Sequence, residues 1–196
     1  GTGMHAIALA RRGYDAAAAD ISAAMIERAR QNAARLLPQA EAARFAVAGF
    51  GGLAGAFASR LPFDALLCLG NSLPHVEDAA HLAAALSDFA ACLRADGLLI
   101  LQNRNFDAVL AQRQRWMTPQ SRRQGDEERI FVRFYDFESG GRITFNILTL
   151  RRAGAENWRQ EASQTRLYPL LQRELGAALE TAGFCLTQDE RGAAGW

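Results

Sequence analysis

Residues 63–78, FDALLCLGNSLPHVED, begin with an apolar run and end in a polar turn. Such a run is typical of a central strand in a parallel sheet, because that strand is buried on both faces. Helical and strand patterns alternate on either side of it. This alternation predicts a doubly wound α/β fold, in which ligands bind beyond the carboxyl ends of the parallel strands.

The residues before this run predict two helices, each followed by a strand. A short helix over 4–12 precedes a strand that closes with Asp20. Ser22 is placed to cap a second helix over 23–37, and residues 43–50 form the next strand with a glycine-rich loop after it. The inward face of the second helix is expected to consist of Met25, Ile26, Ala29 and Ala33.

The residues after the run continue the alternation and then depart from it. An amphipathic helix begins at residue 79 and ends before Gly97, which leads into a strand over 98–105. Period-2 patterns then predict an antiparallel insertion over about 125–167. Its expected strands are 128–137, 142–150 and 158–168, followed by a helix over 170–183 and the start of another strand at 184.

We therefore expect one Rossmann-like α/β domain over residues 1–196, with an antiparallel β insertion that forms a wall or lid over the substrate. A glycine turn like the one at Gly1 normally follows a buried strand. The first strand of the sheet is accordingly expected upstream of this sequence, and its last strand beyond the other end.

The composition argues against several classes of protein. Lys and Arg number 22, Asp and Glu number 21, and the net charge is +1, which is too balanced for a broad nucleic-acid-binding surface. No apolar run approaches the ~20 residues that span a bilayer, and no leader pattern is present. The three cysteines, Cys68, Cys92 and Cys185, show neither disulfide nor zinc spacing and are expected to be buried thiols of a cytoplasmic protein. No metal site is predicted, and the oligomeric state is open.

Glycine-rich or polar turns follow each predicted parallel strand, so they should meet at one edge of the sheet. They comprise Gly1 and Gly3, Asp20, Gly49 and Phe50, residues 70–75, and residues 103–107. The first turn by itself is ambiguous, because Gly1-x-Gly3-x-x-Ala6 also fits a relaxed dinucleotide fingerprint. Asp20 either accepts the ribose hydroxyls of an adenosine cofactor or caps a helix.

Two turns carry a resemblance to a known family. Residues 68–72 (CLGNS) with His75, together with residues 104–107 (RNFD), resemble the glycine and sarcosine N-methyltransferases among the class I S-adenosylmethionine-dependent methyltransferases. The resemblance extends from Gly1 to about Asp107 and returns at residues 165–169 (TRLYP). It implies methyl transfer to the amine of a small molecule, with S-adenosylmethionine as the cofactor.

The resemblance also implies roles for individual residues. The cofactor site would contain the Gly1–Gly3 turn, Asp20 at the ribose, Gly49 and Phe50 at the adenine, and Leu69 and His75 at the methionine end, with Ser72 helping to shape that turn. Asn71 and Arg104 would hold the substrate, because a guanidinium binds a carboxylate through a planar fork. Tyr168 is expected to reach the same pocket. No residue is assigned as a general base, since displacement at a sulfonium requires mainly positioning.

Alternatives remain for several of these residues. Arg104 could instead pair with Asp107, His75 could be an ordinary loop histidine, and Tyr168 could serve packing alone. At Gly49 the family usually offers a polar side chain to the adenine, and this chain has none. Two other functions therefore stay open: a methyltransferase-fold domain that binds the cofactor without turnover, and a nicotinamide-dependent oxidoreductase.

Overall fold

The computed structural model describes residues 1–37 and 43–189, which divide into two compact units. Unit 1 comprises Gly1–Leu66 and Ala83–Leu99, and unit 2 comprises Leu67–Leu82 and the described residues from Ile100 onward. Three elements run from one unit into the other. They are β3 (Phe63–Cys68), α4 (Ala79–Cys92) and β4 (Leu93–Leu101), and β3 pairs with β4 in a two-stranded sheet.

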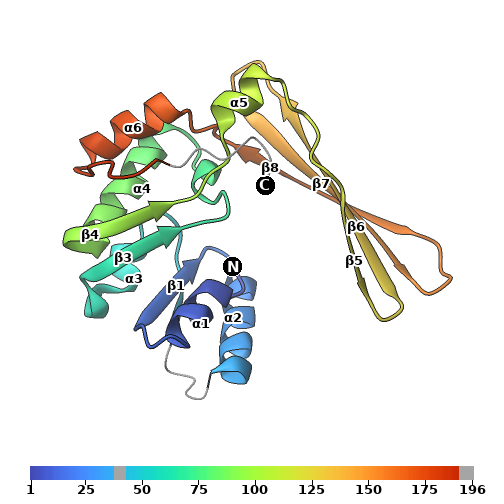
Figure 1. Ribbon diagram of the computed structural model, residues 1–196, viewed down its shortest axis with the longest axis horizontal. Helices are drawn as coiled ribbons and strands as arrows, with labels where there is room; N and C mark the ends of the chain where they lie inside the picture. The colour runs from blue at the N-terminus through green and yellow to red at the C-terminus, as the bar shows by residue number, and fades with distance from the viewer. Residues whose placement is uncertain (38–42, 190–196) are drawn as a thin grey trace. The chain divides into compact units, whose positions relative to one another are not determined.

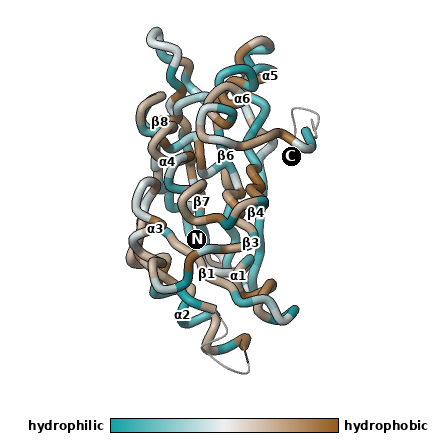
Figure 2. The backbone as a smooth tube through the Cα atoms, turned by 90° about the vertical axis from the view of Figure 1, so that its left-hand side faces the viewer, coloured by the Kyte–Doolittle hydropathy of each residue, from teal (hydrophilic) through white to brown (hydrophobic). Residues whose placement is uncertain are grey.

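Unit 1 is built on a parallel pair of strands, β1 (Ala16–Asp20) and β2 (Ala43–Val47). They are accompanied by two helices, α1 (Met4–Ala10) and α2 (Ala23–Leu36), as Figure 1 shows. The small side chains of β1 allow close packing, and the buried cluster of this unit consists of Ala6, Ile7, Ala16, Ala33, Leu37 and Ala43. Buried residues recur along α2 at Ile26, Ala29 and Ala33, the spacing of an amphipathic helix, and both hydrophilic and hydrophobic residues occur in this helix (Figure 2). The short helices α3 (Leu53–Ala56) and η2 (Ala58–Arg60) follow β2.

Unit 2 is dominated by a four-stranded antiparallel sheet in the order β5-β6-β7-β8. Its strands are β5 (Gln120–Gln124), β6 (Glu127–Phe137), β7 (Ile143–Ala153) and β8 (Arg159–Leu167). The β6–β7 register pairs Tyr135 with Phe145 and Arg133 with Ile147, so odd-numbered residues of both strands share one face. At one end of that face lies the core of the unit, formed by Phe106, Val109, Tyr135, Ile143 and Leu167.

Three short elements complete unit 2: η3 (Leu73–His75), α5 (Phe106–Ala111) and α6 (Gln172–Thr181). The Asn105 side chain caps α5 by accepting a hydrogen bond from the Ala108 amide (3.0 Å). Asp107 accepts a hydrogen bond from the Gln172 amide (2.9 Å). The side chains that follow β4 therefore order both α5 and α6.

Most predicted elements are confirmed, including β1, the Ser22 cap of α2 and the β6–β7–β8 meander. The predicted end of the helix that begins at residue 79 is wrong. That helix ends at Cys92, β4 begins directly at Leu93, and Gly97 lies inside the strand rather than after a helix. The strand predicted at 184 is absent from residues 184–189, and residues 190–196 lie outside the described chain.

Three predictions of burial are also wrong. Met25 is 44 % exposed, because the inward face of α2 is centred on Ile26 and Ala29. Leu67 in the apolar run is 41 % exposed. Within the described residues β3 has β4 as its sole strand partner, so its other edge is not covered by a strand. Cys185 is exposed, whereas Cys68 and Cys92 are buried as expected.

Candidate functional site

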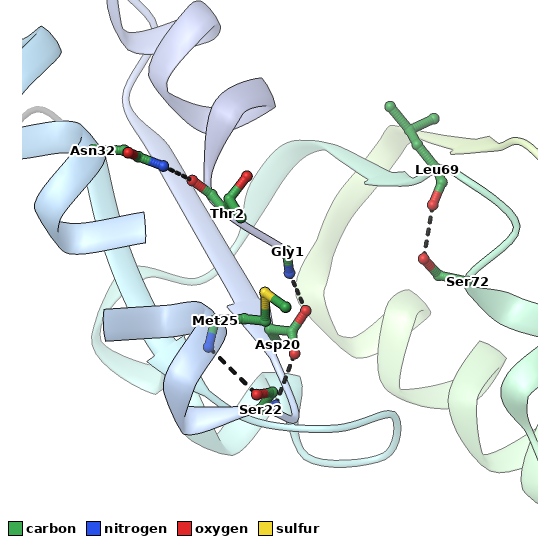
Figure 3. Close-up of polar contacts among 8 residues, drawn as sticks. All are labelled: Gly1, Thr2, Asp20, Ser22, Met25, Asn32, Leu69 and Ser72. Atoms are coloured by element: carbon green, nitrogen blue, oxygen red, sulfur yellow. Dashed lines mark hydrogen bonds and ion pairs between the residues drawn. The ribbon is translucent and has the colours of Figure 1, made fainter. Parts of the chain in front are cut away.

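The Gly1–Gly3 turn of unit 1 is fixed by close packing. Gly3 has a φ of +78°, and a Cβ at this position would lie 2.8 Å from the Ala29 Cβ and 2.9 Å from Cε1 of Phe45. The Asn32 side chain donates a hydrogen bond to the Thr2 carbonyl (3.0 Å; Figure 3). Only glycine fits at position 3, because the turn needs both a left-handed backbone and an absent side chain.

Asp20 ends β1 beside this turn (Figure 3). Its Oδ1 accepts a hydrogen bond from the Ser22 amide (2.7 Å). Partial burial raises the pKa of this carboxyl, whereas the hydrogen bond from the Ser22 amide lowers it and favours the charged form. Asp20 is therefore a carboxylate near neutral pH, as an acceptor of ribose hydroxyls should be.

The Gly49–Phe50 loop is anchored by α4. Both carboxylate oxygens of the buried Asp88 accept hydrogen bonds from the first amides of α3, those of Leu53 (2.8 Å) and Ala54 (3.0 Å). The Phe50 ring lies edge-on against Phe89, with ring centroids 5.7 Å apart. Phe50 nevertheless stays 38 % exposed, so part of its ring is available to stack on a ligand.

In unit 2, Gln102 holds the turn that follows β3. Its side-chain Oε1 accepts a hydrogen bond from the Gly70 amide, and its carbonyl accepts one from the Asn71 amide, both at 3.0 Å. Its own amide donates to the Cys68 carbonyl (3.0 Å). Within the turn, the Ser72 hydroxyl donates to the Leu69 carbonyl (2.8 Å; Figure 3). The turn is thus held by hydrogen bonds to Gln102 as well as by a hydrogen bond between two of its own residues.

The turn at residues 68–72 is also joined to the turn at residues 104–107, through Asn71 and Arg104. Asn71 adopts a left-handed conformation (φ 63°), and its Oδ1 accepts a hydrogen bond from the Arg104 amide (3.0 Å). Asn71 therefore orients the backbone of Arg104, and its remaining amide group is what it can offer to a ligand. The Arg104 guanidinium carbon lies 5.8 Å from the centroid of the Tyr135 ring, a cation–π distance.

A backbone hydrogen bond joins the segment that contains His75 to the segment that contains Tyr168. The Tyr168 amide donates a hydrogen bond to the carbonyl of Pro74, the neighbour of His75 (2.8 Å). Desolvation lowers the pKa of the His75 imidazole, so this side chain is predominantly neutral at pH 7. A neutral imidazole is compatible with the sulfonium charge of the expected cofactor.

The predicted site residues fall into two groups. Unit 1 contains Gly1, Gly3, Asp20, Gly49 and Phe50, whereas unit 2 contains Leu69, Asn71, Ser72, His75, Arg104 and Tyr168. The meeting of both groups at one edge stays a prediction.

Sequence reasoning missed Asp88, Gln102 and Tyr135. Their contacts join residues about thirty positions apart, and the only available signal was the position of Gln102 directly after a strand.

Residues 1–37 and 43–189 contain no group of three or more His, Cys, Asp or Glu side chains placed to hold a metal ion. No helix in these ranges has the length and apolar character needed to cross a membrane.

Sequence comparison relates the chain to methyltransferases. A family profile described as "Methyltransferase domain" matches residues 1–97. The glycine/sarcosine N-methyltransferase of Aphanothece halophytica is 36 % identical over 110 residues, which cover 56 % of this chain and 40 % of that protein. The enzyme of the same name from Parasynechococcus marenigrum is 38 % identical over 114 residues, covering 56 % and 37 %. The match thus spans about two fifths of the length of these curated relatives.

Comparison with solved structures relates the fold to the same class. Streptomyces venezuelae DesVI aligns with a TM-score of 0.77 at 20 % identity, covering 93 % of this chain and 72 % of that one. A methyltransferase from Clostridium acetobutylicum, described as S-adenosylmethionine-dependent, aligns with a TM-score of 0.72 at 16 % identity, covering 93 % and 69 %. The profile match and the curated relatives support membership of the class I S-adenosylmethionine-dependent methyltransferases, and the structural alignments show that the chain has the fold of these enzymes.

Proposed function

We propose that the protein is an N-methyltransferase that transfers the methyl group of S-adenosylmethionine to the amine of glycine, sarcosine or a similar amino acid. The observation that carries this proposal is the hydrogen bond from the Arg104 amide to the Asn71 side chain. It joins the two turns that resemble the glycine and sarcosine enzymes. The names of the curated relatives support the same class of acceptor.

The residues of unit 1 fit an adenosine cofactor. Asp20 is an ionised acceptor at a strand end, and the Gly1–Gly3 turn brings backbone close to it. Phe50 offers an exposed part of its ring to the adenine, with Gly49 beside it. In unit 2, Leu69, Ser72 and His75 would line the methionine end. The cofactor, when bound, supplies a methyl group activated by a sulfonium.

The residues of unit 2 fit an amino-acid substrate. The Arg104 guanidinium would bind the substrate carboxylate through two parallel hydrogen bonds. The Asn71 amide and the Tyr168 side chain would then orient the amine. Attack requires the neutral amine, so these residues act by positioning it and by excluding water. Positioning of this kind contributes ~7–11 kcal/mol in favourable cases.

The test is a methyl-transfer assay on the full-length protein with isotope-labelled S-adenosylmethionine. Arg104→Lys keeps the charge but loses the planar fork, so we expect a higher KM for glycine and an unchanged affinity for S-adenosylhomocysteine. Asp20→Ala should weaken S-adenosylhomocysteine binding in calorimetry. Arg28→Lys, an exposed substitution on α2, is the matched control and should change neither.

Two outcomes would replace this proposal. Cofactor binding without methyl transfer to any amine in a broad panel would indicate a binding domain without turnover, an alternative that the absence of a side chain at Gly49 favours. A substrate-dependent change in nicotinamide absorbance would indicate an oxidoreductase.

A further inference from the structure

A cavity of about 910 Å³ opens on the face of the β5–β8 sheet that carries the odd-numbered residues of β6 and β7. Its lining combines apolar side chains with hydroxyls and cations, and it includes Arg122, Phe131, Arg133, Ile147, Thr149 and Ser163. This volume lies in the range of small-molecule sites, and it greatly exceeds what glycine would fill.

Arg133 is the unusual member of this lining. Its Nε is buried and has no hydrogen-bond partner. In the described part of the chain no carboxylate forms an ion pair with Arg133 or Arg122, whereas Arg129 and Arg151 of the same face both pair with Glu127. A buried donor without a partner is costly, particularly on a charged group. An oxyanion bound in the cavity would offset this cost by pairing with the guanidinium group.

The same face connects this cavity to Arg104. Tyr135 follows Arg133 by two residues on β6, so the two side chains are neighbours on one face. The Arg104 guanidinium carbon lies 5.8 Å from the centroid of the same Tyr135 ring. Burial raises the pKa of Tyr135, and the positive charges of Arg104 and Arg133 both oppose that rise. The charges of two guanidinium groups thus act on one buried ring.

We propose that Arg133 is a specificity-determining residue that binds a second anionic group of the methyl acceptor at the end of the cavity next to Tyr135. This inference rests on the proposed function, in which Arg104 holds the α-carboxylate. It narrows the acceptor class to amino acids whose side chain carries a carboxylate or a phosphate, because both present oxygens in the geometry that a guanidinium binds.

The experiment compares matched amino acids as methyl acceptors for the full-length protein. Aspartate against asparagine tests the carboxylate, and O-phosphoserine against serine tests the phosphate. We expect at least one charged acceptor to have a KM about tenfold or more below that of its neutral partner, the scale of a charge-assisted hydrogen bond. Arg133→Gln should abolish this preference, and Arg133→Lys should restore part of it. Arg123→Gln, an exposed arginine of β5 outside the cavity lining, should leave it intact.

A binding measurement separates this inference from the proposed function. Calorimetry with aspartate and O-phosphoserine, in the presence of S-adenosylhomocysteine, reports the anion subsite without turnover. If no amino acid is methylated but Arg133→Gln still weakens binding of the charged ligand about tenfold, the proposed function fails and the subsite stands. Equal KM and equal binding for charged and neutral partners, or a preference that survives Arg133→Gln, would overturn the inference.

Discussion

Gly3→Ala is expected to destabilise unit 1 through two separable effects. A left-handed backbone costs alanine about 1–2 kcal/mol relative to glycine. The new Cβ would also lie 2.8 Å from the Ala29 Cβ and 2.9 Å from the Phe45 ring, and overpacking of this kind typically costs about 1–3 kcal/mol. Together these effects should lower the free energy of unfolding by about 2–5 kcal/mol.

Gly13→Ala is the matched control for this prediction. Gly13 has a φ of +87°, and a Cβ there would meet nothing within 4 Å. It should therefore show the backbone cost alone, about 1–2 kcal/mol. Denaturant unfolding of both variants, with calorimetry of S-adenosylhomocysteine binding, measures the difference. Equal destabilisation by the two substitutions would refute the claim that Gly3 is required by packing against Ala29 and Phe45.

Three further predictions concern the anchoring of the site. Asp88→Ala removes the acceptor of two α3 amides and should cost about 1.5–3 kcal/mol in denaturant unfolding; an unchanged midpoint would contradict this anchoring. Gln102→Ala loses the side-chain bond to Gly70, so S-adenosylhomocysteine affinity should fall with little loss of stability, about 0.5–1.5 kcal/mol. Because the folded-state pKa of His75 is lowered, the unfolded chain binds its proton more readily, and stability should decline as pH falls below about 6.5. His75→Asn should flatten that part of the pH profile, and an identical decline in the variant would show that another group is responsible.

The elements predicted correctly are those with strong local signals. The Ser22 cap, the period-2 pattern of β6 and β7, and the place of β1 between two helices all act within a few residues. In contrast, β5 is entirely polar and exposed, so it has no hydrophobic alternation and forms through backbone pairing with β6. The six-residue helix α5 is too short for a helical period to be recognised.

The helix end at Cys92 escaped prediction for a related reason. Leu93 to Asp96 contain no residue that stops a helix, and the left-handed Asp96 (φ 61°) lies within β4, where its residue type does not require that conformation. Family resemblance identified the turns around Asn71 and Arg104. It did not indicate the hydrogen bond between Asn71 and Arg104 or the one between Gly70 and Gln102. Both contacts depend on how distant segments fold together.

Transfer of a labelled methyl group from S-adenosylmethionine to an amino acid, followed by mass spectrometry of the product, tests the central claim most directly. The full-length protein should yield an N-methylated amino acid, and Arg104→Lys should raise the amino-acid concentration needed for half-maximal rate without weakening cofactor binding. Tight binding of S-adenosylhomocysteine with no methylated amine from any amino acid would contradict the account.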